Sequence, residues 1–335
     1  MSKYLIINGD DFGMNEAVNR GIVEAHTAGS LSSTSLLVNM AAFEQAIQLA
    51  QQTPTLGVGL HFNLTEGMSI SLADQIPSLV HTGGLFSVNR KQWVAKEIEY
   101  ELSNQYKKMV SAGIQPTHID SHHHIHMEMP MVYIAMKRLA QQMNIPLRMN
   151  LKLKGRINQS SSTEHLILDT YGMPDGITRM LSYLKGMQSG TTEIMTHPSY
   201  PEESVDSLKT EQDWRSKEFL VLTDSLVKDA IREHEIQLIH YGQLANVRGE
   251  NRESVIDDPI KIIDIPQVDY SIQNMDLSSK NEVGQIITNT RVSHKKIRKR
   301  NKKRKRKKKN KSVRRKRILR MRHSKEGKRM RSNQL

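Results

Sequence analysis

The sequence predicts an α/β fold, a parallel β-sheet with covering helices that is either open or closed into a barrel. Short apolar runs alternate along the 335 residues with segments that have the apolar spacing of helices. Acids and histidines directly follow several of these runs, as reactive groups do at the carboxyl ends of parallel strands. A chain of this length can bury one large core or two small ones.

The first third of the chain alternates between expected strands and helices. Residues 4–7 form an apolar run that ends in polar residues, which is typical of a buried strand. Further strands are expected at 35–38 and 56–62, and helices at 15–28 and 42–51. Gly29 is a plausible end for the first of these helices, because glycine adopts the left-handed conformation without strain.

The rest of the body continues the alternation, with one interruption. Residues 69–89 have no clear period and include Gly83-Gly84, so we expect an insertion or lid loop there. Helical spacing predicts helices at 91–112, 130–143 and 213–234, and a mostly helical region at 163–185. The remaining expected strands are 117–127, 146–150, 193–196 and 236–240, with a polar loop at 152–162.

The run THIDSHHHIHM at 117–127 carries five histidines and one aspartate. In an extended chain alternate side chains share a face, so Asp120, His122, His124 and His126 would lie together, joined by His118 if the strand begins there. Imidazoles and carboxylates are common metal ligands. The alternative is a surface histidine-rich tract, but the interleaved Asp and Ile residues favour a metal site. The residues alone do not separate His122 from His124 as the ligand.

Two adjacent carboxylates, Asp10 and Asp11, follow the first expected strand. At a turn from strand to loop both can reach one site, where one acid can bind a cation and the other can act as a base. The alternative is a turn that caps the helix starting near Asn15. His61 and His197 also follow expected strands, although each could be an ordinary core or turn residue. The combination of one acid pair and three histidine-bearing segments, all at expected strand ends, indicates metal-assisted hydrolysis.

Two more polar residues, Arg148 and Asp175, are candidates for the site without forming a clear pattern. The chain has no cysteine, which excludes disulfides and thiolate metal sites and fits a reducing compartment. It has no apolar run of the roughly 18 residues that a membrane span needs. Its first residues turn polar too early for a signal peptide. We therefore expect a soluble protein of the cytoplasm.

The charge of the chain is concentrated at its C-terminal end. Residues 291–335 hold 25 Lys and Arg residues against one acid, Glu326, whereas the rest holds 24 basic and 34 acidic residues. We expect this tail to be disordered, because it repels itself and has little apolar surface to bury. It could bind nucleic acid unselectively through phosphates, but it has no aromatic residue for base stacking. The favoured alternative is a solvated appendage without a role in the chemistry.

Three motifs carry a resemblance to a known family: YLIINGDDFGMN at 4–15, GLHFNLTEG at 59–67 and THIDSHHHIHM at 117–127. They closely resemble the YdjC-like carbohydrate deacetylases, which include the chitooligosaccharide deacetylases, over about residues 1–245. The resemblance implies an irregular TIM-like (β/α) barrel and a divalent cation, usually magnesium. It also implies a homodimer in many cases and the removal of acetyl groups from N-acetylated sugars. A polar extension of unclear structure at 246–290 and the basic tail at 291–335 lie outside it.

The resemblance also assigns roles to individual residues. It matches Asp11, His61 and His122 to the metal ligands, Asp10 to the base and His197 to the acid. Magnesium prefers oxygen ligands, whereas two imidazoles suit zinc or another transition metal, so zinc stays open. The alternatives are a metal-dependent hydrolase of another amide or ester, and a nucleic-acid-binding protein that works through its tail.

Overall fold

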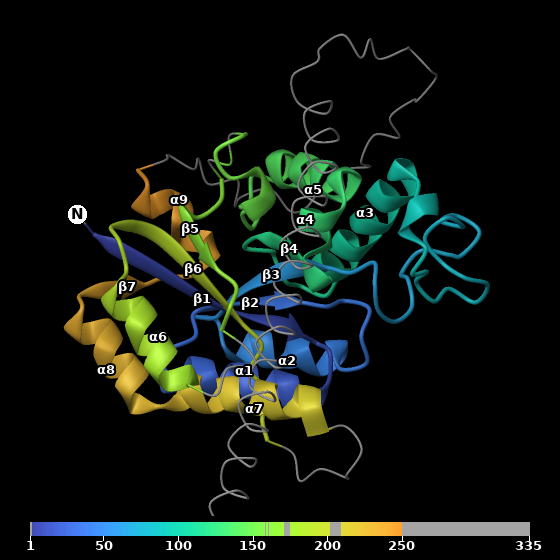
Figure 1. Ribbon diagram of the computed structural model, residues 1–335. Coiled ribbons are helices and arrows are strands. Elements are labelled where there is room, and N and C mark those ends of the chain that lie inside the picture. The colour runs from blue at the N-terminus through green and yellow to red at the C-terminus, as the bar shows by residue number, and fades with distance from the viewer. Residues whose placement is uncertain (1, 158, 160, 171–174, 202–208, 250–335) are drawn as a thin grey trace, which may run out of the picture. The chain divides into compact units, whose positions relative to one another are not determined.

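The computed structural model describes residues 2–157, 159, 161–170, 175–201 and 209–249. Within them, parallel strands form one sheet in the order β4-β3-β2-β1-β6-β5, and β7 also pairs with β1 (Figure 1). This confirms the expected α/β class and the parallel sheet. The strands are β1 Lys3–Phe12, β2 Ser33–Leu36, β3 Gly57–Phe62, β4 Ile119–Ser121, β5 His165–Ile167, β6 Gly190–Thr196 and β7 Ile236–Leu238.

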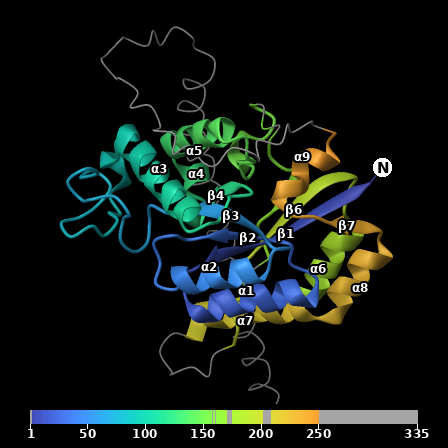
Figure 2. The ribbon, with the colours of Figure 1, turned by 180° about the vertical axis from the view of Figure 1, so that it is seen from behind.

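Helices cover the sheet in two groups. The helices are α1 Glu16–Ala28, α2 Phe43–Gln52, α3 Ala95–Ser111, α4 Ile125–Glu128, α5 Pro130–Gln142, α6 Gly176–Lys185, α7 Lys209–Thr223, α8 Ser225–Glu233 and α9 Leu244–Val247. Helices α1, α2, α6, α7 and α8 lie together on one side, and α3 packs against α5 beside β3 and β4 (Figures 1 and 2). Three residues of β1, Leu5, Ile6 and Ile7, are fully buried between its neighbours.

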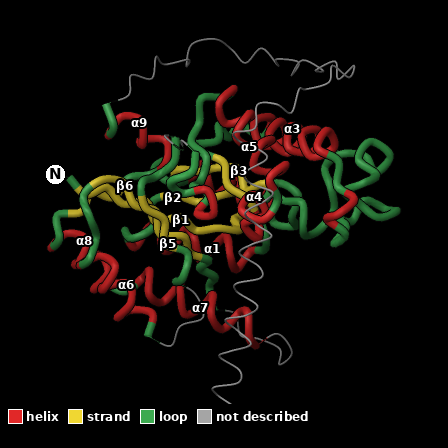
Figure 3. The backbone as a smooth tube through the Cα atoms, turned by 45° about the horizontal axis from the view of Figure 1, so that its top comes forward, coloured by secondary structure: helices red, strands yellow, loops and turns green. Residues whose placement is uncertain are grey.

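The sheet curls into a half-barrel (Figure 3). Strand β1 lies at its centre and pairs with β2 near its carboxyl end and with β6 along most of its length. Among the described strands, β4 and β5 are the two ends of the order, so the expected TIM-like barrel takes an open form here. All carboxyl ends of these strands point the same way, which brings the residues that follow them to one edge.

Local sequence explains where the first helix begins and ends. The Asn15 side chain accepts a hydrogen bond from the backbone N–H of Val18 at 2.9 Å, which caps the start of α1. Gly29 ends the helix in the left-handed conformation, with a φ of 91°. The Asp-Asp pair therefore takes no part in capping this helix.

The structure corrects three of the expected segments. The region 163–185 is not mostly helical, because β5 pairs with β6 before α6 begins. Residues 213–234 lie in two helices, since α7 ends at Thr223 and the Asp224 side chain caps the new helix α8. At 146–150 there is a single bridge, between Leu147 and Ile119, in place of a strand. The first and third errors come from short segments whose partners are distant in sequence, whereas the second comes from a local helix cap at Asp224.

The region 69–89 is a loop, as expected, and two antiparallel bridges organise it. Met68 bridges to Leu85, and Val80 bridges to Phe86. The helix expected at 91–112 starts only at Ala95, after a short 3-10 turn at Arg90–Gln92. No helix within the described ranges combines the length and apolar character needed to span a bilayer.

The expected boundaries after residue 245 fall mostly outside the described residues. The description ends at residue 249, just after α9. The extension at 246–290, apart from its first four residues, and the basic tail at 291–335 therefore lie outside it. Their boundaries, and the disorder expected of the tail, stay predictions.

Candidate metal centre

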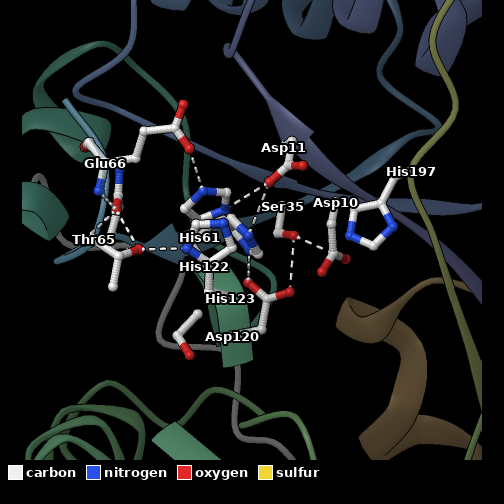
Figure 4. A network of polar contacts seen from close by, with 12 residues as sticks. Asp10, Asp11, Ser35, His61, Thr65, Glu66, Asp120, His122, His123 and His197 are labelled. Carbon is white, nitrogen blue, oxygen red and sulfur yellow. Dashed lines mark hydrogen bonds and ion pairs between the residues drawn. The ribbon is translucent and has the colours of Figure 1, made fainter. Parts of the chain in front are cut away.

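The acid pair lies at a break in the regular pairing of β1. The register between β1 and β2 shifts between Gly9 and Phe12, and Asp11 has a φ of 74°. A left-handed conformation at a non-glycine residue is strained, and it is retained where the surroundings impose it. The break allows both neighbouring carboxylates, Asp10 and Asp11, to enter one buried polar network (Figure 4).

The histidine-rich run is not one extended strand, so the expected shared face is wrong. Strand β4 ends at Ser121, and His123 and His124 have φ values of 52° and 50°. These two left-handed residues turn the chain into α4, so the run does not keep the alternation of a strand. The rings of the consecutive residues His122 and His123 instead lie next to each other, with centroids 3.9 Å apart. Alternation along a strand cannot predict their positions, because the backbone leaves the strand conformation within the run.

Two further histidines of the run, His118 and His126, lie in the protein interior. The His118 ring stacks on Tyr241 with a centroid distance of 4.0 Å. The Nδ1 atom of His126 lies 2.5 Å from the Ser121 hydroxyl. Burial lowers the pKa of both imidazoles to about 3, so each ring is neutral near pH 7. We interpret them as core residues of the run.

The three expected ligands come together. Asp11, His61 and His122 offer ligand atoms that all lie within 4.8 Å of one another. The Asp11 Oδ1 atom lies 3.3 Å from His61 Nε2 and 2.9 Å from His122 Nδ1. The cluster includes His122, the first of the three consecutive histidines, and His124 is not part of it. All three side chains are buried.

Each of these imidazoles meets a second carboxylate through its other nitrogen. The His61 Nδ1 atom lies 2.7 Å from Asp120 Oδ1, and the His122 Nε2 atom lies 2.9 Å from Glu66 Oε2. Burial by itself lowers the pKa of His61, but the charge of Asp120 and the hydrogen bonds to Asp11 and Asp120 raise it to about 10. The pKa of His122 is also raised, because hydrogen bonds to Asp11 and Glu66 outweigh its burial.

This donor set fits a divalent cation. A neutral imidazole has one N–H, yet both nitrogens of each ring face carboxylate oxygens. Either each ring carries an extra proton, or the nitrogen that faces Asp11 directs its lone pair at a cation. One carboxylate with two imidazoles is a common donor set for zinc and other transition metals. Magnesium more often binds through oxygen ligands alone.

A buried arginine holds the neighbouring acid in place. Arg148 donates from Nη1 to Asp10 Oδ2 and from Nη2 to Asp10 Oδ1, both at 2.7 Å. Its guanidinium also lies 2.7 Å from carboxylate oxygens of Asp120 and Glu193. Burial raises the pKa of Asp10, but the charge of Arg148 outweighs this and lowers it overall. Asp10 is therefore ionised and fixed in one orientation.

A second arginine contacts the acid of the cluster. Arg215 of α7 donates to Asp11 Oδ2 at 2.6 Å, which leaves Oδ1 facing the two imidazoles. Burial works against ionisation of Asp11, but the hydrogen bonds from His122 and His61 hold its pKa well below the usual range. One oxygen of Asp11 is thus paired with a permanent cation, and the other is directed at the cluster.

His197 follows β6, as expected, and lies beside the acid pair. Figure 4 shows its ring next to the Asp10 carboxylate. The ring meets Trp214 edge to face at 5.3 Å, and the His197 backbone N–H donates to Glu218 Oε2 at 2.5 Å. Burial lowers the pKa of His197 to about 4 and raises the pKa of Glu218 to about 7. His197 is therefore neutral at pH 7 in this state.

Sequence reasoning missed several members of this network. Glu66 lies within the GLHFNLTEG motif, so its position in the motif was an available signal. Glu193, Arg215 and Glu218 have no comparable signal, because they come from distant elements and repeat no pattern. The other polar candidate, Asp175, is not in the cluster and pairs instead with Arg179 at 3.6 Å.

Comparison with known proteins identifies the family. A sequence-family model described as "YdjC-like protein" matches residues 4–233. The chain belongs to the YdjC-like family. A relative named carbohydrate deacetylase from Geobacillus stearothermophilus is 39% identical to this YdjC-like chain over 247 residues, covering 72% of this chain and 98% of the relative. A relative named chitooligosaccharide deacetylase from Proteus mirabilis is 36% identical over 261 residues, covering 73% of this chain and all of the relative.

A solved structure agrees with the fold of this YdjC-like chain. It is the crystal structure of an Enterococcus faecalis V583 protein that carries a provisional name for cellobiose-phosphate cleavage. The two chains share 30% sequence identity and superpose with a TM-score of 0.66, over 73% of this chain and 99% of that one. The likeness supports the half-barrel architecture along nearly the whole of the solved chain.

Proposed function

We propose that this YdjC-like chain is a carbohydrate deacetylase, a metal-dependent hydrolase that removes acetyl groups from N-acetylated sugars of the chitooligosaccharide type. The observation that carries this proposal is the convergence of Asp11, His61 and His122 at one edge of the sheet, beside Asp10 and His197. The names of the relatives supply the substrate class. Amide hydrolysis needs an activated water, a proton acceptor and a proton donor, and these residue types can provide them.

The cation would be held by Asp11, His61 and His122. When bound, a divalent cation supplies a Lewis acid that lowers the pKa of water and polarises the acetyl carbonyl. Asp10 accepts the proton of the attacking water, and Arg148 keeps its carboxylate oriented for that transfer. Arg215 holds the far oxygen of Asp11, so the near oxygen stays directed at the cluster.

His197 donates a proton to the departing nitrogen, because an unprotonated amide nitrogen is a poor leaving group. Burial keeps the free ring neutral near pH 7, so the ring gains this proton during the reaction, from the Asp10 carboxyl, which has taken it from the water and lies beside the ring. The carboxylates of Asp10 and Asp11 favour the charged ring and oppose the effect of burial. The products are acetate and a free amino sugar.

The deciding experiment is the release of acetate from N,N′-diacetylchitobiose by the full chain after metal removal and after re-addition of Mg²⁺ or Zn²⁺. We expect metal-dependent release by the wild type and none by His122→Ala, because that variant removes a ligand. Lys152→Met is the matched surface control, since the Lys152 side chain is exposed and forms an ion pair with the exposed Glu128 side chain. Full activity of His122→Ala would remove this assignment, and activity on other acetylated amides or esters alone would favour the nearer alternative.

The identity of the cation, the homodimer and the cytoplasmic location are parts of the same proposal. Zinc fits the two imidazoles, and magnesium is the ion that the family resemblance implies. Metal analysis of the purified chain distinguishes the two ions. Light scattering tests the dimer, and a mass corresponding to one chain would exclude it.

A further inference from the structure

We propose that Glu66 is a positioning residue for the cation centre. It holds the His122 ring so that Nδ1, and not Nε2, faces Asp11. The inference rests on the proposed function in one respect, because it takes His122 as a ligand. Glu66 itself lies on the outer side of that ring, with its Oε2 atom 2.9 Å from Nε2 (Figure 4). Glu66 determines the orientation and the tautomer of the His122 ring. In the described hydrogen bonds it contacts neither the acid pair nor His197.

The chemistry of imidazole links this contact to the cation. A neutral ring carries its proton on one nitrogen, and the partner of that nitrogen decides which one. Donation from Nε2 to the Glu66 carboxylate leaves the lone pair of Nδ1 directed at Asp11, 2.9 Å away. Carboxylates in such outer positions also raise the basicity of the ligating imidazole.

The backbone around Glu66 is held by two amide side chains, the buried Asn63 and the partly buried Asn39. The Asn63 side chain accepts from the backbone N–H of Glu66 at 3.1 Å and donates to its carbonyl at 2.8 Å. Asn39 donates to the same carbonyl at 3.1 Å. Two amide side chains therefore fix both polar backbone groups of the residue. A surface glutamate without a structural task does not need this support.

Helix α3 anchors the same loop from behind. Gln105 accepts from the Asn63 N–H at 3.0 Å and donates to the Asn63 carbonyl at 2.6 Å. Glu101 accepts from the N–H groups of Ile70 and Ser71, each at 2.9 Å, and from the Gln105 amide at 2.8 Å. Both anchoring side chains are fully buried. These hydrogen bonds to α3 hold the loop in a position that places the Glu66 carboxylate beside His122.

The other imidazole of the cluster has the same arrangement. Asp120 contacts the outer nitrogen of His61 as Glu66 contacts the outer nitrogen of His122. In both rings one nitrogen contacts a carboxylate and the other faces Asp11. Because the two rings come from different segments, this repetition argues against a chance contact between Glu66 and His122. A competing arrangement is a separate cation held by Glu66, His122 and His123, whose ligand atoms also lie within 4.8 Å of one another. That arrangement requires Nε2 of His122 as the ligand atom.

Calorimetric titration of the metal-free full chain with Zn²⁺, and with Co²⁺ for its visible spectrum, tests the proposal. We expect one cation per chain in the wild type and about 10–100-fold weaker binding in Glu66→Ala, the usual effect of removing an outer partner. Glu66→Gln keeps an acceptor oxygen and should bind with intermediate affinity. Both variants should shift the visible bands of bound Co²⁺, because the ligating ring changes its position.

Thr65→Val is the matched control on the same loop. Its hydroxyl lies 3.0 Å from His123 Nδ1 and makes a long hydrogen bond of 3.4 Å to Asn63 Oδ1. The substitution removes both contacts but leaves His122 and the bond from the Glu66 N–H to Asn63 in place. We expect wild-type affinity and spectrum in this variant. Unchanged affinity and spectrum in both Glu66 variants would overturn the inference and leave the proposed function standing.

Two other results would also overturn the inference. Loss of a second cation in the Glu66 variants, with the first still bound tightly, would show that Glu66 is a ligand of its own site. A wild-type chain that binds neither ion would remove the cation centre, and the proposed function would fail with it. Urea unfolding of each variant verifies that the changes in binding occur in folded protein.

Discussion

The two imidazoles of the candidate cation centre have similar partners in very different surroundings. His61 contacts the Asp120 side chain, which is 0% exposed, whereas His122 contacts the Glu66 side chain, which is 45% exposed. Asp120 is also bonded by the Ser35 hydroxyl at 2.8 Å and paired with Arg148. Glu66 owes its position mainly to a loop whose backbone is anchored to α3.

The difference shows two ways to hold a ligating imidazole in place, one by Asp120 on the buried side of the centre and one by Glu66 on its exposed side. On the buried side, charges are held by other charges, because an unpaired buried carboxylate is costly. On the exposed side, the carboxylate can be hydrated, so its position depends on the backbone that carries it. The buried side should therefore control stability together with metal affinity, and the exposed side should control metal affinity alone.

The largest expected effect comes from removing the buried guanidinium group of Arg148, which pairs with the carboxylates on the buried side of the centre. Arg148→Met leaves Asp10, Asp120 and Glu193 without their shared partner in the protein interior. We expect a loss of about 3–5 kcal/mol in the free energy of unfolding, as for other broken buried ion pairs. Urea unfolding monitored by circular dichroism measures it. A loss below about 1 kcal/mol, the range of surface pairs, would show that the buried side is not held by this charge.

Removing each outer carboxylate in turn compares the two sides directly. Asp120→Asn should weaken Zn²⁺ binding by about 10–100-fold, as expected for an outer partner, and should also destabilise the fold. Glu66→Gln should weaken binding less and leave the unfolding midpoint close to that of the wild type. Titration calorimetry and urea unfolding of both variants test this. Equal losses of stability would contradict the distinction drawn between the two sides.

The core histidines of the same run predict a dependence of stability on pH. Burial depresses the pKa of His118 and His126 from the usual 6.5 to about 3, so the unfolded chain binds their protons first as the pH falls. The contribution of these two rings to the free energy of unfolding should therefore be fully retained above about pH 6.5 and should decrease from there toward pH 3. In His126→Asn the decrease between pH 6.5 and 4.5 should be shallower, and an unchanged slope would contradict the assignment.

The smallest effect is expected at the surface. Lys152 and Glu128 form an ion pair at 2.8 Å with side chains that are 55% and 54% exposed. Exposed pairs of this kind contribute between about 0 and 1 kcal/mol. Lys152→Met should therefore change the unfolding midpoint little, in contrast to Arg148→Met. A large change in the unfolding midpoint of Lys152→Met would mean that depth of burial does not explain why buried and exposed ion pairs differ in their effect on stability.

The sequence predicted the fold where its pattern was long or sharply bounded. The helix 15–28 is confirmed because Asn15 and Gly29 mark its two ends with local chemistry. The strand β5 was missed because it has three residues, half-buried, and is defined only by its pairing with β6. The alternation in the histidine-rich run predicts one strand, because it cannot foresee two successive left-handed residues.

The candidate site divides in a similar way. The residue types beside the expected strand ends, an acid pair and several histidines, could be read from the sequence by itself, and the family resemblance assigned their roles and favoured His122 over His124. Only the tertiary structure decided that Arg148 pairs with Asp10 from 138 positions away and that Arg215 reaches Asp11 from 204 positions away. Local patterns report the conformation of a segment, whereas these contacts depend on how the sheet curls and where its strand ends meet.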